Sequence, residues 1–591
     1  MRIIDRINLL RNLMQFENID ALLIFGTDPH LSEYVPIAWR SVEWISGFTG
    51  SYGKIVITKD KAMLWTDSRY YIQAEEQLKD TGIVMMKDRH PDTISIDNWL
   101  IMELKSENLV AIDGQTISYS EISKLKIKLG AKGIDLIINK DLVSLIWKNR
   151  PLLHQRPIED YPLQFDGQSR SEKLAVIRKR LTELEVDATL ICQLDDLAWS
   201  TNLRGSDIKY IPCFTGFGYI DHNQFILFIN KGNISKELAE ILNSEGIQIM
   251  DYNSLFMVLE KILPTSIFLD PERTNSIIYG FYSGRTKIVE GVAIPTSLKS
   301  IKNKVEIAGI RAAHRRDGVA MINFLYWINK QTGDEILTEI SISKKLRDFR
   351  SEQKYFIGES FSPIVGFGPH GAIVHYSATA ETNATIEGNG ILLFDSGGQY
   401  LDGTTDITRT IALGKVNSTQ KNDFTLVLKG MINLAKAKFP VGTKGYSLDV
   451  LARIALWNSG LNYGHGTGHG VGHYLSVHEG PMSIRSEFNN EPIRSGQILS
   501  NEPGLYRKDK YGIRIENVIL CQNEINSTSE PFLSFETLTL CPIDRNLIKR
   551  ELLNSEELNW INNYHKKVLR IMKPFLKPEV QKWLIIQCAP L

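Results

Sequence analysis

The stretch GILLFDSGGQYLDGTTDITRTIAL, residues 390–413, contains two strand-like runs that each carry an aspartate. The first run, GILLFD, is apolar and ends in Asp395, which is typical of a buried strand. The second, TTDITRTIAL, alternates so that Asp406, Thr408 and Thr410 share one face. The pattern predicts neighbouring antiparallel strands with both carboxylates side by side, although either aspartate alone better fits a strand cap or a solvent-facing side chain.

Two glutamates follow in strand-like surroundings, Glu502 in NEPGLY and Glu516 in YGIRIENVIL. In the second run Arg514 and Glu516 point to one face, opposite Ile513 and Ile515. A glutamate buried unpaired in an apolar strand costs on the order of several kcal/mol, so Glu516 needs a partner. That partner is either the adjacent Arg514 or a cation shared with other carboxylates.

The stretch NYGHGTGHGVGHYLSVHEGP, residues 462–481, holds four of the twelve histidines of the chain. These histidines could bind a metal ion, act as a catalytic base or pack in a glycine-rich loop. With the four carboxylates above, His469 would complete an oxygen-rich site that favours Mn²⁺, Co²⁺ or Fe²⁺ and also admits zinc. Clustered carboxylates repel one another unless cations lie between them. Two divalent ions roughly 3.5–4 Å apart would resolve this and lower the pKa of a bridging water towards about 7.

Length and composition indicate an ordinary multidomain globular protein. The 591 residues exceed what one hydrophobic core usually serves, so two to four domains are expected. The 68 basic and 68 acidic residues cancel, which argues against a general affinity for nucleic acid or anionic membranes. Five scattered cysteines without a CxxC pair suit a reducing compartment. The N-terminus reads as an amphipathic helix rather than a signal peptide, and no apolar run could span a bilayer, so we expect a cytoplasmic location with no membrane partner.

Three segments differ in pattern, which predicts domains at 1–150, 151–300 and 301–591. The first two segments alternate helical and strand-like patterns, typical of α/β domains. IDALLI at 19–24 in the first reappears as VDATLI at 186–191 in the second. Either an internal duplication or two unrelated α/β domains would explain this similarity.

The third segment opens with apolar residues at helical spacing in KNKVEIAGIRAAHRRDGVAMINFLYWINK, which predicts one or two long helices. From 355 to 540 the pattern is largely that of strands, and from about 545 to 580 it is helical again. In the first segment, residues 27–51 are expected to form a long functional loop. The predicted fold class is therefore two α/β domains before a larger α+β domain.

Six motifs in the third segment occur in an order that resembles a known family. They are DSGGQY with Asp395, TDITRT with Asp406, GHGTGHGVGH with His469, VHEGP with His478, SNEPG with Glu502 and GIRIEN with Glu516. Together they resemble the aminopeptidase P (Xaa-Pro aminopeptidase) branch of the pita-bread metallopeptidases, in its three-domain cytosolic form. WISGFTGS, WTDSRYY and NLRGSD extend the resemblance over nearly the whole chain. It implies two creatinase-N-terminal-like α/β domains before a pita-bread α+β catalytic domain with a helical C-terminal tail.

The resemblance implies a dinuclear metal site. Its five ligands would be Asp395, Asp406, His469, Glu502 and Glu516. Asp406 and Glu516 would bridge two divalent ions, with Mn²⁺ as the first expectation and Co²⁺ or Zn²⁺ as alternatives. Arg514 would support the carboxylates from behind, which makes its ion pair part of the site.

The resemblance also implies catalytic and substrate-binding roles. Glu502 matches the general base that takes a proton from the bridging water. His375, in PHGAIVHYSA, matches a histidine that steadies the tetrahedral intermediate. His465 and His478 match histidines around the scissile bond and the proline pocket. The family motif assigns no role to His473.

The implied reaction is hydrolysis of the bond between an N-terminal residue and a following proline, by a metal-bridged hydroxide. Peptides with proline at the second position would be the substrates, and a homodimer is expected. A prolidase shares the fold and metals but cleaves only dipeptides; the VHEGP motif and the three-segment layout favour aminopeptidase P over it. A metal-free binding protein on the same fold or a creatinase-like hydrolase would also be compatible with the general pattern, but the retained ligand set argues against both.

Overall fold

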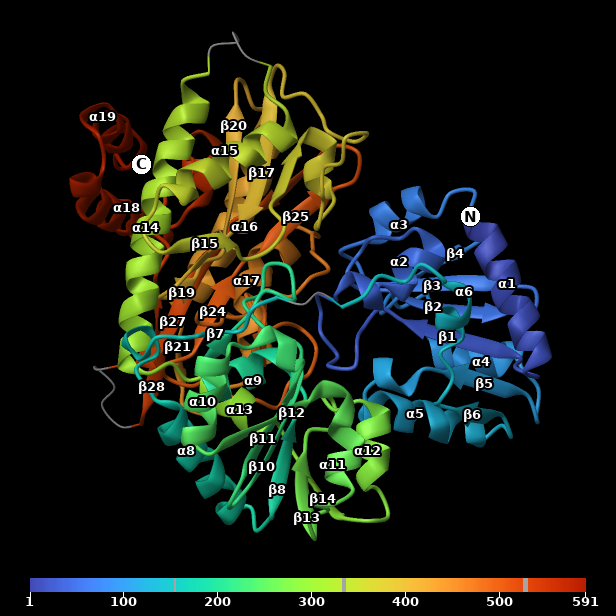
Figure 1. Cartoon of the computed structure of the whole chain (residues 1–591). Helices are drawn as coiled ribbons and strands as arrows, with labels where there is room; N and C mark the ends of the chain where they lie inside the picture. Colours follow the sequence, from blue (N-terminus) through green and yellow to red (C-terminus); the bar gives the residue numbers. More distant parts are fainter. Residues whose placement is uncertain (154–155, 332–335, 525–529) are drawn as a thin grey trace. The chain divides into compact units, whose positions relative to one another are not determined.

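The computed structural model describes residues 1–153, 156–331, 336–524 and 530–591 (Figure 1). They form two compact units, each described by itself below. Unit 1 comprises Met1–Tyr161 and Gln168–Thr296, and unit 2 comprises Pro162–Gly167 and Ser297–Leu591. The domain boundaries expected at 150/151 and 300/301 stay a prediction.

Unit 1 begins with a six-stranded sheet in the order β4-β3-β2-β1-β5-β6. Its strands are β1 (Ala21–Phe25), β2 (Lys54–Thr58), β3 (Ala62–Thr66), β4 (Val84–Lys87), β5 (Leu109–Ile112) and β6 (Asp135–Ile137). Its helices are α1 (Ile3–Phe16), α2 (Ser41–Ser46), α3 (Tyr71–Gln77), α4 (Ile96–Glu103), α5 (Tyr119–Gly130) and α6 (Leu142–Ile146). Strand β1 is buried throughout because Leu22 and Ile24 pack into one hydrophobic cluster and Leu23 into another. Residues 27–51 are not a continuous loop, since they contain α2.

A second six-stranded sheet in unit 1 has the order β12-β11-β10-β8-β13-β14. Its strands are β8 (Ala188–Ile191), β10 (Gly216–Asp221), β11 (Phe225–Ile229), β12 (Ile247–Asp251), β13 (Ser266–Leu269) and β14 (Lys287–Glu290), and β7 (Glu159–Asp160) pairs separately with β9 (Leu203–Arg204). Its helices are α8 (Arg170–Glu183), α9 (Leu194–Thr201), α10 (Lys236–Ser244), α11 (Leu255–Leu259) and α12 (Ser276–Tyr282). Strand β8 pairs antiparallel with β10 and parallel with β13, as β1 pairs with β2 and β5. This shared pairing supports the duplication that the repeated strand sequence suggested.

Unit 2 is organised along the helix α14 (Lys304–Asn329), which runs the length of the unit in Figure 1. The expected one or two helices are thus a single helix of 26 residues. It begins with a capping box, in which the Asn303 side chain and the Glu306 side chain each bond the other's backbone N–H. The sequence boundary between the units, at Thr296, falls within α13 (Ile294–Lys299). Further helices of unit 2 are α7 (Leu163–Asp166), α15 (Glu339–Ser351), α18 (Ser555–Met572) and α19 (Pro578–Gln587). The last two form the helical tail that the sequence predicted.

The described residues of unit 2 form four sheets, in the orders β15-β18-β19, β16-β17-β20, β21-β28-β27-β24-β22-β23 and β25-β26. Their strands are β15 (Phe356–Glu359), β16 (Ile364–Phe367), β17 (Gly390–Ser396), β18 (Gly398–Tyr400), β19 (Gly403–Thr404), β20 (Ile407–Leu413), β21 (Lys438–Pro440), β22 (Gly468–Gly470), β23 (Glu479–Ile484), β24 (Ile498–Asn501), β25 (Gly504–Arg507), β26 (Tyr511–Arg514), β27 (Asn517–Asn523) and β28 (Phe532–Thr537). The continuous strand expected around Glu516 is divided, because β26 pairs with β25 while β27 pairs with β24 and β28.

The expected strand pattern between 355 and 540 is interrupted by two helices, α16 (Ser418–Ala435) and α17 (Gly445–Trp457). Helix α16 begins with a capping box between Asn417 and Gln420, a helix-start signal that the apolar run FTLVL concealed. Gly430 lets α17 approach closely, because a Cβ atom there would lie 2.1 Å from the Ala452 carbonyl oxygen.

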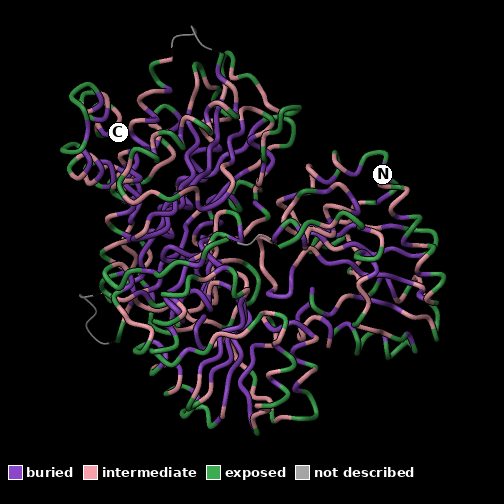
Figure 2. The backbone as a smooth tube through the Cα atoms, in the orientation of Figure 1, coloured by how far each residue is buried: buried purple, intermediate pink, exposed green. Residues whose placement is uncertain are grey.

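Buried residues, purple in Figure 2, concentrate in the strands and inner helix faces of each unit. The thiols of all five cysteines are buried as well. Burial raises the pKa of Cys192, Cys521 and Cys588 to about 12 and that of Cys541 to about 11. Among the described residues, no helix is both long enough and apolar enough to cross a membrane.

Candidate metal centre

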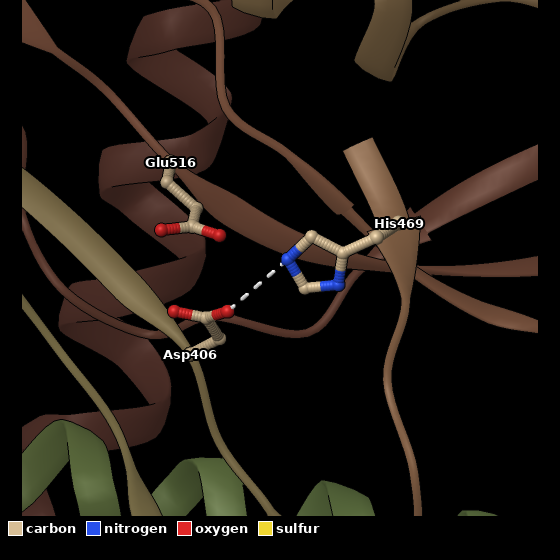
Figure 3. A group of neighbouring side chains, drawn as sticks. All are labelled: Asp406, His469 and Glu516. Atoms are coloured by element: carbon tan, nitrogen blue, oxygen red, sulfur yellow. Dashed lines mark ion pairs between the residues drawn. The ribbon is translucent and has the colours of Figure 1, made fainter. Parts of the chain in front are cut away.

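Asp406, His469 and Glu516 bring three side chains together in unit 2 (Figure 3). One ligand atom from each lies within 4.8 Å of the others. The two carboxylates face each other, and the imidazole points its Nε2 edge towards them, 3.6 Å from Oδ2 of Asp406. Glu502 joins this group, since its Oε1 lies 3.3 Å from the same Nε2.

The register of two strand pairs explains this convergence. Strands β17 and β20 are antiparallel with Asp395 opposite Thr408, which confirms the predicted antiparallel neighbours. Strands β24 and β27 are antiparallel, and Asn501 lies opposite Asn517. Glu502 directly follows β24 and Glu516 directly precedes β27, so both glutamates lie at the same end of this strand pair. The two pairs meet because the Glu516 N–H donates to the Thr408 carbonyl at 3.1 Å.

Two glycines allow His469 to reach this position on β22. A Cβ atom at Gly468 would lie 2.1 Å from the Ser500 carbonyl oxygen, and one at Gly470 would lie 2.4 Å from that of Glu479. The ring nitrogen Nδ1 of His469 is 2.9 Å from the Gly470 carbonyl oxygen, which assigns the ring proton to Nδ1. Nε2 then carries the lone pair, the form that a metal ion requires.

Ionisation of the carboxylates in the cluster is unfavourable without a nearby positive charge. Burial, together with neighbouring carboxylates, raises the pKa of Asp406 and of Glu516 well above their ordinary values. Burial also raises the pKa of Glu502 to about 7, with Arg514 acting in the opposite direction. A cation between these groups would offset both causes.

Within the cluster, two buried carboxylate oxygens have no hydrogen-bond donor among the described residues, namely Oδ1 of Asp395 and Oε1 of Glu516. Buried acceptors are almost always paired in proteins, so these two atoms have room for a cation rather than a donor. Four carboxylates and one imidazole form a hard donor set that suits divalent manganese, cobalt, iron or zinc. The residues present therefore fit a divalent metal site.

Arg514 resolves the choice that the sequence left open. Its guanidinium donates from Nη2 at 2.6 Å and from Nε at 3.2 Å to Oδ2 of Asp395. Its partner is thus Asp395, and Glu516 instead accepts from the Thr408 hydroxyl at 2.8 Å. This arrangement leaves Oδ1 of Asp395 and Oε1 of Glu516 without a donor among the described residues.

Tyr506 was missed by the sequence reasoning and connects Arg514 with His465. Arg514 Nη1 donates to the Tyr506 hydroxyl at 2.6 Å, and that hydroxyl lies 2.8 Å from Nε2 of His465. The alternation in NEPGLY places Glu502 and Tyr506 on the same strand face, which was the available signal.

The remaining predicted histidines take different positions. The rings of His478 and His469 meet edge-on with centroids 4.4 Å apart, so His478 lies beside the cluster. His375 directly follows Val374, whose carbonyl oxygen is 3.4 Å from Nη2 of Arg514. His473 bonds elsewhere, with its Nε2 3.0 Å from the Phe165 carbonyl oxygen. It therefore holds residues 162–167 within unit 2.

Comparison with family models covers most of the chain. Metallopeptidase family M24 matches residues 308–523, and the C-terminal region of peptidase M24 matches residues 531–591. The creatinase/prolidase N-terminal domain matches twice, at residues 6–140 and 149–306. The two N-terminal matches correspond to the two six-stranded sheets of unit 1.

Several relatives that match over the full length are named aminopeptidase P or Xaa-Pro aminopeptidase. Aminopeptidase P1 of Lotus japonicus is 36% identical, with 98% of each chain covered, and Xaa-Pro aminopeptidase 1 of Dictyostelium discoideum is 38% identical, with 99% of this chain and 96% of that one covered. The crystal structure of X-prolyl aminopeptidase from Caenorhabditis elegans, described as a cytosolic enzyme with a di-nuclear active site, superposes over 100% of both chains with a TM-score of 0.97 and 35% identity. The chain belongs to the aminopeptidase P family.

Membership of the aminopeptidase P family confirms the predicted fold class, two creatinase-like α/β domains before a pita-bread α+β domain. Dipeptidases share part of this fold. Xaa-Pro dipeptidase from Bacillus anthracis superposes with a TM-score of 0.51 and 22% identity over 64% of this chain. The aminopeptidase P family is thus the full-length match, and the dipeptidase likeness concerns the fold alone.

Proposed function

We propose that this chain is a metal-dependent aminopeptidase that hydrolyses the bond between an N-terminal residue and a following proline. The observation that carries the proposal is the convergence of Asp406, His469, Glu502 and Glu516, in a chain that matches aminopeptidase P relatives over its full length. The chain is accordingly a metallo-exopeptidase of the M24 family.

Two divalent ions would be held by the five residues that the sequence motifs nominate, Asp395, Asp406, His469, Glu502 and Glu516. Asp406 and Glu516 would bridge the ions, and the carboxylate-rich donor set makes Mn²⁺ our first choice over Co²⁺ or Zn²⁺. Divalent ions held in this way lower the pKa of a bound water towards about 7 and so supply hydroxide at neutral pH.

The residues of the chain would divide the remaining work. Glu502, whose Oε1 lies beside Nε2 of His469, takes the proton from the attacking water. His375 steadies the tetrahedral intermediate by donating to its oxygen. Arg514 holds Asp395 in place through two N–H donors to Oδ2, so that Oδ1 of Asp395 would be available to an ion.

His465 and His478 would bind the substrate around the scissile bond and the proline ring. The edge-on contact of His478 with His469 places it beside the cluster, and the bond of His465 to Tyr506 fixes the position of its Nε2. Proline lacks an N–H and has a fixed φ, so a site for it must recognise the ring rather than a donor. Substrates would therefore be peptides with proline at the second position.

We also propose a cytoplasmic homodimer with the three-domain division at 1–150, 151–300 and 301–591. A row of exposed apolar side chains on α17 supports a contact between copies, since Tyr446, Val450, Ile454 and Trp457 recur at helical spacing. Val450→Glu would place a charge in this row, and sedimentation of that variant as a monomer is the expected result. A dimer that survives the substitution would exclude this face.

A peptide panel tests the activity. The protein, loaded separately with Mn²⁺, Co²⁺ or Zn²⁺, should release the first residue from Xaa-Pro-Pro-Yaa peptides and leave Xaa-Ala peptides largely intact. Turnover of the Xaa-Pro dipeptide alone would make the chain a prolidase. Absence of cleavage, with less than one ion bound per chain after addition of manganese, would make it a metal-free binding protein.

A further inference from the structure

Glu339, the first residue of α15, is a fully buried carboxylate outside the metal cluster. Every hydrogen-bond partner of its side chain is a donor. Oε1 lies 2.9 Å from the Phe367 backbone nitrogen and 2.9 Å from Nδ1 of His370, and Oε2 lies 2.8 Å from the Tyr376 hydroxyl and 3.0 Å from the Ala384 backbone nitrogen. One buried side chain therefore collects four donors.

All four donors come from one segment of the chain, residues 367–384. Phe367 and Ala384 are its two ends, while His370 and Tyr376 lie inside it with their rings stacked at 4.5 Å. The backbone of α15 supports the same arrangement, because the Glu339 N–H donates to the Ala384 carbonyl at 3.2 Å. Glu339 thus closes this segment into a loop on the N-terminal end of α15.

The segment carries His375, which stands between two anchored neighbours. On one side the Val374 carbonyl oxygen accepts from Arg514, which holds Asp395. On the other side the Tyr376 hydroxyl donates to Glu339. The backbone of His375 is therefore fixed from the metal cluster and from α15 at once.

We propose that Glu339 is a positioning residue for the peptidase reaction, which acts by holding residues 367–384 so that His375 meets the substrate. The inference rests on the role given to His375 under the proposed function. Because His375 would act on the tetrahedral intermediate, a displaced loop lowers kcat more than it raises KM.

A carboxylate is required at this position by its chemistry. An ionised glutamate only accepts hydrogen bonds, and it can serve all four donors. A glutamine of the same shape would turn an NH₂ group against either the Phe367 N–H or the Ala384 N–H. The N-terminal end of α15 also favours a negative charge. Glu339→Gln is therefore a nearly isosteric change that opens the loop.

Hydrogen exchange tests the inference without reference to activity. In Glu339→Gln, amides of residues 367–384 should exchange at least about tenfold faster than in the parent protein, while the rest of unit 2 keeps its rates. Glu557→Gln is the matched control, since Glu557 is also a buried carboxylate in the first turn of a helix and pairs with Lys429 at 2.7 Å. The control should leave exchange of residues 367–384 unchanged, and an unchanged rate in Glu339→Gln would overturn the proposal.

Kinetics on an Xaa-Pro-Pro-Yaa peptide complete the test. Glu339→Gln should lower kcat at least about tenfold with KM within about threefold, whereas Glu557→Gln should lower thermal stability without lowering kcat. In a His375→Ala background the Glu339→Gln change should cost almost nothing further, because both act through one side chain.

The outcomes separate the two claims. If the double variant loses kcat by the product of the two single losses, or if Glu339→Gln is fully active, the role of Glu339 is overturned while that of His375 stands. An undiminished kcat in His375→Ala would instead overturn the proposed role of His375 and this inference with it. Inactivity of the parent protein towards every peptide would remove the proposed function itself.

Discussion

Three carboxylates of the candidate metal cluster each have a supporting hydrogen-bond donor. Asp395 accepts from Arg514, Glu516 from the Thr408 hydroxyl, and Glu502 from the Ser500 hydroxyl at 3.0 Å. In Asp395 and Glu516 these bonds use Oδ2 and Oε2, and they leave Oδ1 and Oε1 without a donor among the described residues. The partners orient the carboxylates while leaving negative charge for cations, a division common to metal sites.

Replacement of Glu502 by glutamine should separate activity from folding. Glu502→Gln keeps the shape of the side chain but cannot take a proton, so we expect kcat to fall by about 10²–10⁴. Burial raises the pKa of Glu502 to about 7, so the ionised form is costly and the metal-free variant should melt no lower than the parent protein. Peptidase assays and thermal unfolding of the apo protein measure the two effects. An unchanged kcat would remove Glu502 from the mechanism.

His565 on α18 should make stability depend on pH. It is fully buried, it accepts the Ile543 N–H at 3.1 Å, and burial together with Arg409 and Arg545 lowers its pKa from 6.5 to about 3. Below pH 6.5 the unfolded chain binds a proton that the folded chain refuses, so this contribution to stability is lost as the pH falls from 6.5 towards 3. Between pH 6.5 and pH 5 the loss would be about 2 kcal/mol.

The variant His565→Gln, which can still accept the Ile543 N–H, should remove that pH dependence. Urea unfolding at pH 7 and pH 5 should show a smaller loss of stability on acidification in the variant than in the parent protein. Equal losses in the two proteins would contradict the assignment of this group.

The sequence predicted the carboxylates of the candidate cluster and Arg514 as their support, but not the other supporting residues. Asp395, Asp406, Glu502 and Glu516 stood out because a carboxylate at a strand position is costly without a partner. Tyr506 and Glu339 did not, since an alternating Tyr or an N-terminal Glu on a helix is unremarkable by itself. Their contacts depend on which strands pair and in what register, and this is decided by tertiary packing.

At the scale of elements, strands and helices were predicted unequally well. Helix α14 and strands β1, β17 and β20 were predicted because each keeps a single hydrophobic pattern along its length. Helix α16 was missed because it is buried on most faces, and α17 because its exposed face carries apolar side chains, so neither shows a clear polar alternation. The division of the strand around Glu516 was missed because the alternation of apolar and polar residues continues unbroken across it. Only the pairing shows the division, since β26 pairs with β25 and β27 pairs with β24.

Two helical glycines should respond oppositely to the same substitution. In Gly430→Ala the new Cβ would lie 2.1 Å from the Ala452 carbonyl oxygen, so α16 and α17 must separate at a cost of about 1–3 kcal/mol. Gly280 on α12 has no atom within 4 Å of such a Cβ, and Gly280→Ala should stabilise its helix by about 0.5–1 kcal/mol. Calorimetry should therefore show a lower Tm for the first variant and a higher Tm for the second. A stable Gly430→Ala would mean that the helix contact is loose.

At the scale of the whole molecule, the proposed ions belong to unit 2 alone. The five nominated ligands lie between residues 395 and 516, whereas unit 1 ends at Thr296. Ligands that bind only the folded state stabilise the unit that holds them, by about 2.7 kcal/mol at a hundred times Kd.

Removal of metal should consequently destabilise one unit and spare the other. Chelation should lower the melting transition of unit 2, addition of Mn²⁺ should restore it, and the transition of unit 1 should stay constant in differential scanning calorimetry. In His469→Ala the manganese-dependent shift should shrink or vanish. A shift of both transitions, or of neither, would contradict a site confined to unit 2.

The sequestered thiols of this protein have a practical corollary. A thiolate is the form that attacks maleimide dyes. All five thiols are buried, and the raised pKa of Cys192, Cys521, Cys541 and Cys588 further disfavours the thiolate at neutral pH. Native cysteines can therefore remain in place during bioconjugation. One engineered surface cysteine in each unit would accept a donor and an acceptor fluorophore, and energy transfer between them would report whether the distance between the units changes when a peptide binds.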